Sequence, residues 1–300
     1  MNYHWWIQKL LRAMPWLALM AMPCLVQAQP AMQDGLPPGI IQQDKGLIAV
    51  KDQMPMVRIA AGPLQMGSMN GAHDEKPLHS VILSAYLIDQ HEVTNAQFAR
   101  FVAESHYQPQ GPYMRGFTKG TEQMPVRFVT WHDAAAYARW AGRTLPTEAQ
   151  WERAAKGPKS LTYPWGDAYQ AGLARLGGAV ADGPIAVGSL LQGASAEGCL
   201  DMAGNVWEWV ADWYDRYGYA AVAANTLNPS GPADGTPPEE RFRKNSTASG
   251  NERSTLKVIR GGAWSSRPDM ARAAVRMWSS PEHWLNDTGF RCALPLEKKP

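Results

Sequence analysis

Two carboxylates flank a glycine in the stretch DMAGNVWEW, which runs from Asp201 to Trp209. Glu208 lies between two tryptophans there. A buried glutamate without a partner costs several kcal/mol or takes up a proton. The stretch is typical of a loop that runs into a strand, so Glu208 and Val206 should face one way and the tryptophans the other. We therefore expect a specific positive group to hold Glu208.

Two partners for Glu208 remain open from the residues alone. If the glycine at 204 turns the chain back, Asp201 and Glu208 converge, and two carboxylates with free backbone carbonyls form an oxygen-only site that suits Ca²⁺. Alternatively, an arginine such as Arg272 or Arg276 forms a salt bridge with Glu208. Either group supplies the positive charge that the apolar stretch lacks.

The first 28 residues have the pattern of an export signal. Lys9 and Arg12 precede an apolar run from Met14 to Val26, and a cleavage site is expected after Ala28. The run is short for a bilayer span, and no other stretch is long and apolar enough for a membrane helix. We expect a periplasmic protein without a membrane span.

Removal of the signal leaves two of the three cysteines, Cys199 and Cys292. In an oxidising compartment the default is a disulfide, which stabilises by roughly 2–4 kcal/mol. The alternative is a pair of free thiols at a reactive site. The flanking residues EGCLD and GFRCA contain no histidine or helix start that would lower a thiol pKa. We therefore predict a Cys199–Cys292 disulfide.

Short helices and strands must position these groups. Thr94 with Gln97 and Thr147 with Gln150 form capping-box patterns that open two helices. An apolar face predicts a further helix in HDAAAYARWAG. Closing strands are expected in LKVIRGGAW and TGFRCALPL, and a proline-, glycine- and serine-rich loop over 225–255. We divide the chain into a signal (1–28), a leader or linker (29–53) and one domain (54–296).

Composition narrows the function. The chain has 300 residues, a formal net charge of +2 and 45% hydrophobic residues, which indicates a globular protein with a sizeable core. The absence of a lysine or arginine block argues against nucleic-acid binding. There is no GxSxG, Walker A, HExxH or CxxC motif, and the histidines have no metal-ligand spacing.

Ordered motifs give the chain a family resemblance. It resembles the formylglycine-generating enzyme (sulfatase-modifying factor) family. The motifs, in order, are HEVTNAQFARFV, RTLPTEAQWERAAKG, YPWGD, LDMAGNVWEWVADWY, VIRGGAW and TGFRCA. The resemblance covers nearly all of the mature chain. It implies an α+β fold, a variant of the C-type lectin fold with little regular secondary structure.

The resemblance also implies a structural calcium ion. The matching ligands are the side chains of Asp201 and Glu208 and the carbonyls of Gly204 and Val206. A second family calcium site, after the PWG motif, lacks its expected pattern here.

The catalytic motif differs from that of the family. In catalytic members two cysteines bind copper, and the matching positions here are Ser266 and Ala271. Serine is a poor Cu(I) ligand and alanine is none, so we expect no copper.

Other residues of the family groove remain as candidates. We expect Trp207, Ser266, Arg267 and Asp287 to contribute to binding. Glu282 is a candidate general base if a neighbouring tryptophan raises its pKa, and His283 a candidate partner. The alternatives are a solvated glutamate and a surface histidine.

Three functions follow from this site. The first is periplasmic oxidative maturation of a peptide or siderophore precursor, similar to the cysteine-free member that matures the pyoverdine chromophore. The second is a non-catalytic, calcium-stabilised binding module for a peptide, glycan or protein. The third is a sulfatase-activating enzyme, which the missing cysteines disfavour.

Overall fold

A computed structural model describes residues 35–44, 46–232 and 256–296. The chain divides into two units, Met1–Gly35 and Leu36–Pro300, and the described helices and strands belong to the second. The expected export signal and most of the expected loop over 225–255 lie outside the described residues. Within the described ranges, no helix combines the length and the apolar character needed to cross a bilayer.

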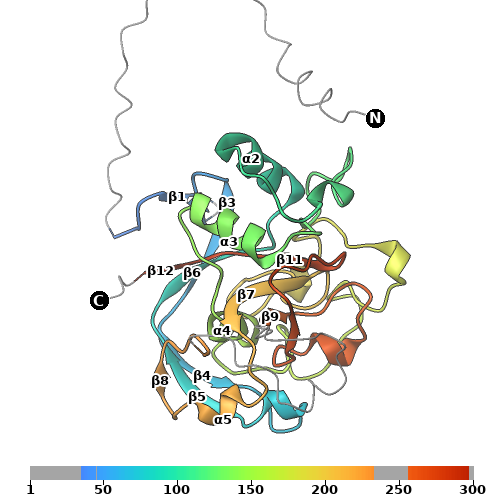
Figure 1. Cartoon of the computed structure of the whole chain (residues 1–300). Helices are drawn as coiled ribbons and strands as arrows, with labels where there is room; N and C mark the ends of the chain where they lie inside the picture. The colour runs from blue at the N-terminus through green and yellow to red at the C-terminus, as the bar shows by residue number, and fades with distance from the viewer. Residues whose placement is uncertain (1–34, 45, 233–255, 297–300) are drawn as a thin grey trace, which may run out of the picture. The chain divides into compact units, whose positions relative to one another are not determined.

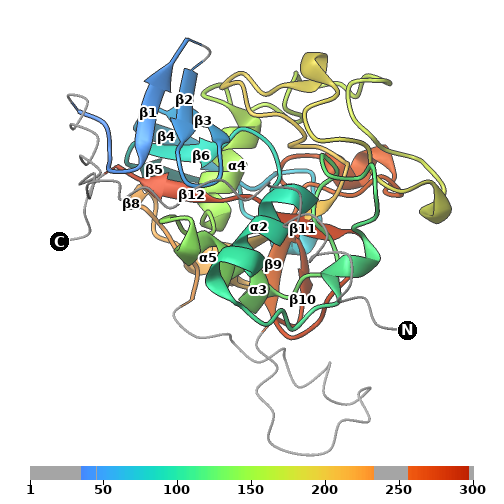
Figure 2. The ribbon, with the colours of Figure 1, turned by 90° about the horizontal axis from the view of Figure 1, so that it is seen from above.

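The largest sheet has five antiparallel strands. Their order is β1 (Ile40–Gln43), β2 (Gly46–Ala49), β3 (Met54–Ile59), β6 (Tyr86–Asp89) and β12 (Ala293–Pro295). β1 and β2 lie beside β3 (Figure 2). The expectation that 29–53 is a leader or linker is therefore wrong for residues 40–49. These residues form a hairpin that extends the sheet, and Ile40 and Ala49 are buried.

A four-stranded sheet carries the DMAGNVWEW stretch. Its order is β10 (Met277–Ser279), β9 (Lys257–Arg260), β7 (Trp207–Trp213) and β11 (Thr288–Phe290), with β7 and β11 parallel. The expected strand at Glu208 and the expected closing strands are confirmed. A third sheet contains β4 (Gly62–Met66), β5 (His79–Leu83) and β8 (Thr226–Leu227).

The helices are α2 (Asn95–Ser105), α3 (Trp131–Trp140), α4 (Glu148–Lys156) and the short α5 (Gly218–Ala221). Both expected capping boxes are present, because Thr94 and Thr147 each exchange hydrogen bonds with the glutamine three residues later. α2 and α3 pack together and lie side by side (Figure 1). Five 3-10 turns complete the described elements: η1 (His73–Glu75), η2 (Tyr113–Arg115), η3 (Val180–Asp182), η4 (Leu191–Gly193) and η5 (Pro268–Ala271).

The apolar core consists of two clusters, and each contains one cysteine. Cys292 packs in the cluster that includes Phe98, Tyr137 and Phe290, and Cys199 packs in the cluster of Trp151. Both cysteines are fully buried free thiols. The structure therefore contradicts the predicted disulfide. The expectation of an oxidising compartment led to the predicted bridge, but the fold uses each thiol as a small apolar side chain.

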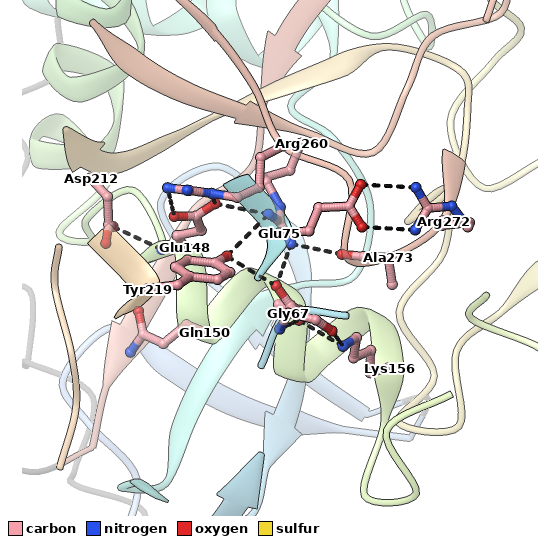
Figure 3. A network of polar contacts seen from close by, with 12 residues as sticks. Gly67, Glu75, Glu148, Gln150, Lys156, Asp212, Tyr219, Arg260, Arg272 and Ala273 are labelled. Atoms are coloured by element: carbon pink, nitrogen blue, oxygen red, sulfur yellow. Dashed lines mark hydrogen bonds and ion pairs between the residues drawn. The ribbon is translucent and has the colours of Figure 1, made fainter. Parts of the chain in front are cut away.

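A network of buried ion pairs connects α4 to β9 and to the segment after it (Figure 3). Arg260 pairs with Glu148 at 2.8 Å and with Glu152 at 2.5 Å. Glu148 also pairs with Arg276, and Glu152 with Lys156. Each of these carboxylates is thus shared by two cations, which offsets the cost of removing the charges from water.

Candidate functional site

Glu208 is fully buried on β7, and Arg291 holds it. Arg291 Nε donates to Oε2 and Nη2 donates to Oε1, each at 2.7 Å, while Trp151 Nε1 donates to Oε2 at 2.9 Å. A bidentate arginine is the strongest of the common partners for a carboxylate. The expected arginine is therefore present, but it is neither Arg272, which pairs with Glu75, nor Arg276, which pairs with Glu148.

The parallel pairing of β7 and β11 brings Arg291 to Glu208. Gly289 lies opposite Glu208, and Arg291 follows two residues later on the same side of the chain. The guanidinium also donates to the carbonyls of Asp89, Gln90 and Leu200. Burial alone would lower the pKa of Arg291, but the Glu208 carboxylate raises it above its usual range. Arg291 therefore stays charged and joins three segments of the chain.

Two more carboxylates surround this pair. Burial raises the pKa of Glu92 well above its usual range, and the charges of Asp201 and Glu208 raise it further. Asn205 Nδ2 donates to Glu92 Oε1 at 3.0 Å, whereas the buried Oε2 has no hydrogen-bond partner. The Arg291 guanidinium pairs with Glu208, and its charge opposes the rise in the pKa of Glu92 without reversing it. Glu92 must bind a proton or a cation, because an unpaired buried carboxylate is costly.

The loop before β7 has the backbone geometry of a tight turn. Asp201, Gly204 and Asn205 all have positive φ, at 57°, 78° and 61°. A Cβ on Gly204 would lie 2.3 Å from the carbonyl oxygen of Arg175, so only glycine fits there. Asp201 Oδ2 accepts the Gly188 N–H at 2.6 Å, which fixes the carboxylate on this loop.

These residues fit a bound cation through their charge. The orphaned Glu92 Oε2 and the excess of acids over guanidinium favour a positive ion, and all the donors are oxygens. Glu208 has fewer free lone pairs for a metal ion than expected, because Oε2 already accepts two hydrogen bonds and Oε1 accepts one. Among the described side chains, no three His, Cys, Asp or Glu are grouped as metal ligands. A calcium site would therefore need the carbonyls of Gly204 and Val206.

The two positions that match the family's cysteines are occupied by small groups with structural contacts. Ser266 Oγ accepts the N–H of Ala263 at 2.9 Å and so closes a turn. Ala271 is fully buried, and its Cβ lies 3.4 Å from the position that a Cβ on Gly262 would take. Ser266 thus has no adjacent base among the described hydrogen-bond partners, which leaves it a weak nucleophile.

Glu282 and His283 lie on the surface. The Glu282 side chain is 67% exposed; its Oε2 accepts a short hydrogen bond from Ser280, and its Oε1 lies 3.7 Å from His132 Nε2. Partial burial raises its pKa, but the bonds from Ser280 and His132 outweigh this and lower it. The expected raised pKa is therefore wrong. The histidine beside Glu282 is His132 rather than His283, and the catalytic roles of both candidates stay predictions.

The expected binding residues fall into two places. Trp207 N–H donates to the carbonyl of Asp287 at 2.8 Å, so these two residues meet at the start of β7. Burial raises the pKa of the Asp287 carboxyl. Arg267 is exposed and pairs with its neighbour Asp269 at 2.8 Å. Arg267 and Asp269 form a surface ion pair. Among the described residues, no contact joins Arg267 to Trp207 or to Asp287.

Sequence reasoning missed a cluster of arginines and aromatic rings near Asp287. Arg115 Cζ lies 4.9 Å from the Trp284 ring centre, and the Trp284 and Phe128 rings are 6.0 Å apart. Arg127 Cζ lies 5.3 Å from the Phe128 ring and 5.1 Å from the Trp264 ring. We call these five residues the arginine–aromatic cluster. Adjacent basic and aromatic letters in VRFV were the only signal in the sequence.

Residues 46–296 match the model of the sulfatase-modifying factor enzyme 1-like domain family. The chain is 34% identical over 256 residues to the serine/threonine-protein kinase pkn1 of Chlamydia pneumoniae, covering 79% of this chain but only 37% of that protein. It is 30% identical over 300 residues to a formylglycine-generating enzyme of Streptomyces coelicolor, covering 79% and 88% of the two chains.

A solved structure supports the fold. The structure of PvdO from Pseudomonas aeruginosa aligns with a TM-score of 0.63 and 24% identity, covering 82% of this chain and 95% of that one. The expected α+β fold of the formylglycine-generating-enzyme type and the family resemblance are thereby confirmed.

Proposed function

Because the chain belongs to the sulfatase-modifying factor enzyme 1-like domain family, we propose that it is a periplasmic maturation enzyme that oxidises a peptide siderophore precursor of the pyoverdine type. Oxidation here means loss of two hydrogens from an aromatic group of the precursor, as two electrons and two protons passed to an oxidant such as dioxygen. The family supports an oxidative or maturation role in general, and the substrate is the specific part of the proposal.

One observation carries the proposal. The family motif at β7 is present, but Ser266 and Ala271 occupy the positions where the resemblance implies thiols. Trp264, two residues before Ser266, connects through Arg127 to the aromatic rings of Phe128 and Trp284. Copper–thiolate chemistry needs soft ligands, which serine and alanine do not supply. An aromatic surface suits an aromatic peptide, because ring faces pack in offset or edge-to-face contacts.

A calcium ion completes the proposed site. It would be held by Asp201, by the carbonyls of Gly204 and Val206 and by one oxygen of Glu208, and its charge would compensate Glu92. Such an ion supplies structural charge compensation. The support is the orphaned Glu92 oxygen and the excess of carboxylates at this position.

A second candidate is a non-catalytic binding module. It is favoured by the exposure of Glu282, whose pKa is lowered, and by the hydrogen-bonded hydroxyl of Ser266. Neither group has the environment of an activated acid–base or nucleophilic residue. The same arginine–aromatic cluster would then hold a partner without chemistry.

Deletion of the gene separates the two candidates. Mass spectrometry of the secreted metabolites should show a precursor two hydrogens heavier than the normal product, and wild-type complementation should restore the product. Complementation with Glu282→Gln then tests the catalytic residue, with the exposed Glu122→Gln as matched control. An unchanged metabolite profile in the deletion strain would contradict oxidative maturation and favour the binding module.

A further inference from the structure

Arg127 differs from the arginines of the core in its charge balance. All five buried arginines make an ion pair with a carboxylate: Arg143, Arg153, Arg260, Arg276 and Arg291. Arg127 is half-buried, and it makes no ion pair with a described carboxylate; the charge of Asp287 acts on it only from beyond ion-pair distance. A guanidinium that is partly removed from water without an anion is costly, so its position favours the arrival of an anion.

The hydrogen bonds of Arg127 are also incomplete. Nη1 donates to the carbonyl of Asn286 at 2.7 Å, whereas the buried Nε has no partner. Burial lowers the pKa of Arg127, and the nearby charge of Asp287 raises it only in part. In contrast, and against the effect of burial, Tyr219, Glu152 and Glu148 raise the pKa of Arg260, and Glu208 raises that of Arg291, above the usual range.

Aromatic faces complete the surroundings of this cation. Arg127 lies within cation–π distance of both Phe128 and Trp264. Phe128 contacts Trp284, which is 39% exposed, and the exposed Arg115 lies over the Trp284 ring. A chain of contacts therefore runs from the half-buried Arg127 through the Phe128 and Trp284 rings to the exposed Arg115.

The backbone holds this cluster in an unusual conformation. Phe128 has φ of 58°, a region that a bulky side chain rarely adopts. Its N–H donates to the Leu285 carbonyl at 3.0 Å, and a Cβ on Gly116 would lie 3.3 Å from its ring. Such strain persists only where surrounding contacts enforce it, and it concentrates at ligand sites. Contacts between the segments 115–128 and 284–287 thus fix four residues of the cluster, and Trp264 joins them through Arg127.

We propose that the arginine–aromatic cluster binds an acidic side chain that lies next to an aromatic ring in a peptide substrate. The carboxylate pairs with Arg127 and Arg115, and the ring packs on Trp284 and Phe128. Arginine presents planar donors that match a carboxylate, and tryptophan presents a large apolar face. The inference deepens the proposed function, on which it rests for the peptide nature of the substrate.

Binding of two dipeptides tests the proposal directly. Isothermal titration calorimetry of the purified protein would compare N-acetyl-Glu-Tyr-amide with its neutral counterpart N-acetyl-Gln-Tyr-amide. We expect the acidic peptide to bind about tenfold to a hundredfold more tightly, the usual worth of a hydrogen bond to a charged group. Arg127→Gln should remove this preference, and Trp284→Leu should lower the affinity for both peptides.

Two further variants keep the test decisive. The exposed Arg115→Gln should reduce the preference for the acidic peptide even if Arg127→Gln does not fold, and Arg100→Gln, an exposed arginine paired with Glu104, should leave it unchanged. Equal binding of the two peptides, no binding at millimolar concentration, or an equal loss in Arg100→Gln would overturn the proposal. Because titration needs no turnover, its failure is distinct from an unchanged metabolite profile.

Discussion

The network around Arg260 and the cluster around Arg127 use the same kind of side chain in opposite ways. Arg260 is fully buried and pairs with two carboxylates that other cations share (Figure 3). Arg127 is half-buried and contacts one carbonyl and two aromatic rings, and the charge of Asp287 compensates it only in part, without an ion pair among the described residues. A charge that the fold already compensates serves the fold, whereas an uncompensated charge near the surface indicates a ligand.

The largest effect should come from removing Arg260. Arg260→Leu leaves Glu148 and Glu152 with one cation each in a buried setting, and the loss of one partner from a buried pair costs roughly 3–5 kcal/mol. Urea unfolding of this variant should show that loss, or the protein should fail to accumulate. A stability within the error of the wild type would mean that the network adds little to the fold and would remove the contrast with Arg127.

The next effect concerns Asp212, which borders the network. Burial first, and then the charge of Glu148, raise the pKa of Asp212 from 3.8 to about 7. A raised acid pKa means that the folded state binds the proton more tightly than the unfolded state does. The stabilisation by protonated Asp212 is therefore fully present below about pH 4 and is lost as the pH rises through about 7. Relative to Asp212→Asn, the wild type should lose roughly 4 kcal/mol across this window.

Thermal unfolding of both proteins from pH 4 to pH 8 measures this difference. Asparagine keeps an oxygen for the Glu148 N–H, which donates to Asp212 at 2.8 Å. Parallel curves for the wild type and Asp212→Asn would show that Asp212 titrates normally.

Calcium should have a moderate effect, and Glu92 should determine it. In Ca²⁺ at a hundred times its Kd, the wild type should gain about 2.7 kcal/mol over chelator. Glu92→Gln should gain much less, while keeping the oxygen that Asn205 contacts. Glu208→Gln is a poorer test, because it also breaks the bond pattern with Arg291. A wild-type melting temperature that ignores both chelator and calcium would contradict the site.

The smallest effect is expected at the cysteines. In denaturant without reductant, alkylation should modify both Cys199 and Cys292, since both are free. In the native protein neither should react, because both are buried and burial raises the pKa of Cys199 to about 12. Intact-mass measurement should show two added alkyl groups in denaturant and none in the native protein. Modification that requires reductant would restore the disulfide prediction.

Local patterns allowed part of this structure to be predicted. The capping boxes at Thr94 and Thr147 depend on residues three apart, and the strand at Glu208 on alternation, so the sequence displays both. The need for a partner on Glu208 also followed from burial alone. The identity of that partner did not, because 83 residues separate Glu208 from Arg291 and only the β7–β11 pairing joins them.

Other features depend entirely on tertiary contacts. The pKa of Glu92 is raised first by burial and then by the charges of Asp201 and Glu208, and all of these arise only from tertiary packing. The cysteines appeared bridgeable from their compartment, but they pack in different core clusters. Arg127 and Trp284 lie more than 150 residues apart in the chain and meet through Phe128. The Glu282 pKa was misjudged because its contacts with Ser280 and His132 could not be foreseen.

Complementation of the deletion strain with Arg127→Gln tests the central claim most directly, with metabolite mass spectrometry and the melting temperature measured on the same variant. We predict a melting temperature close to that of the wild type together with accumulation of the precursor two hydrogens heavier than the product. A normal product from a normally folded variant, or a variant that loses product only because it unfolds as Arg260→Leu does, would contradict the assignment of Arg127 to the ligand rather than to the fold.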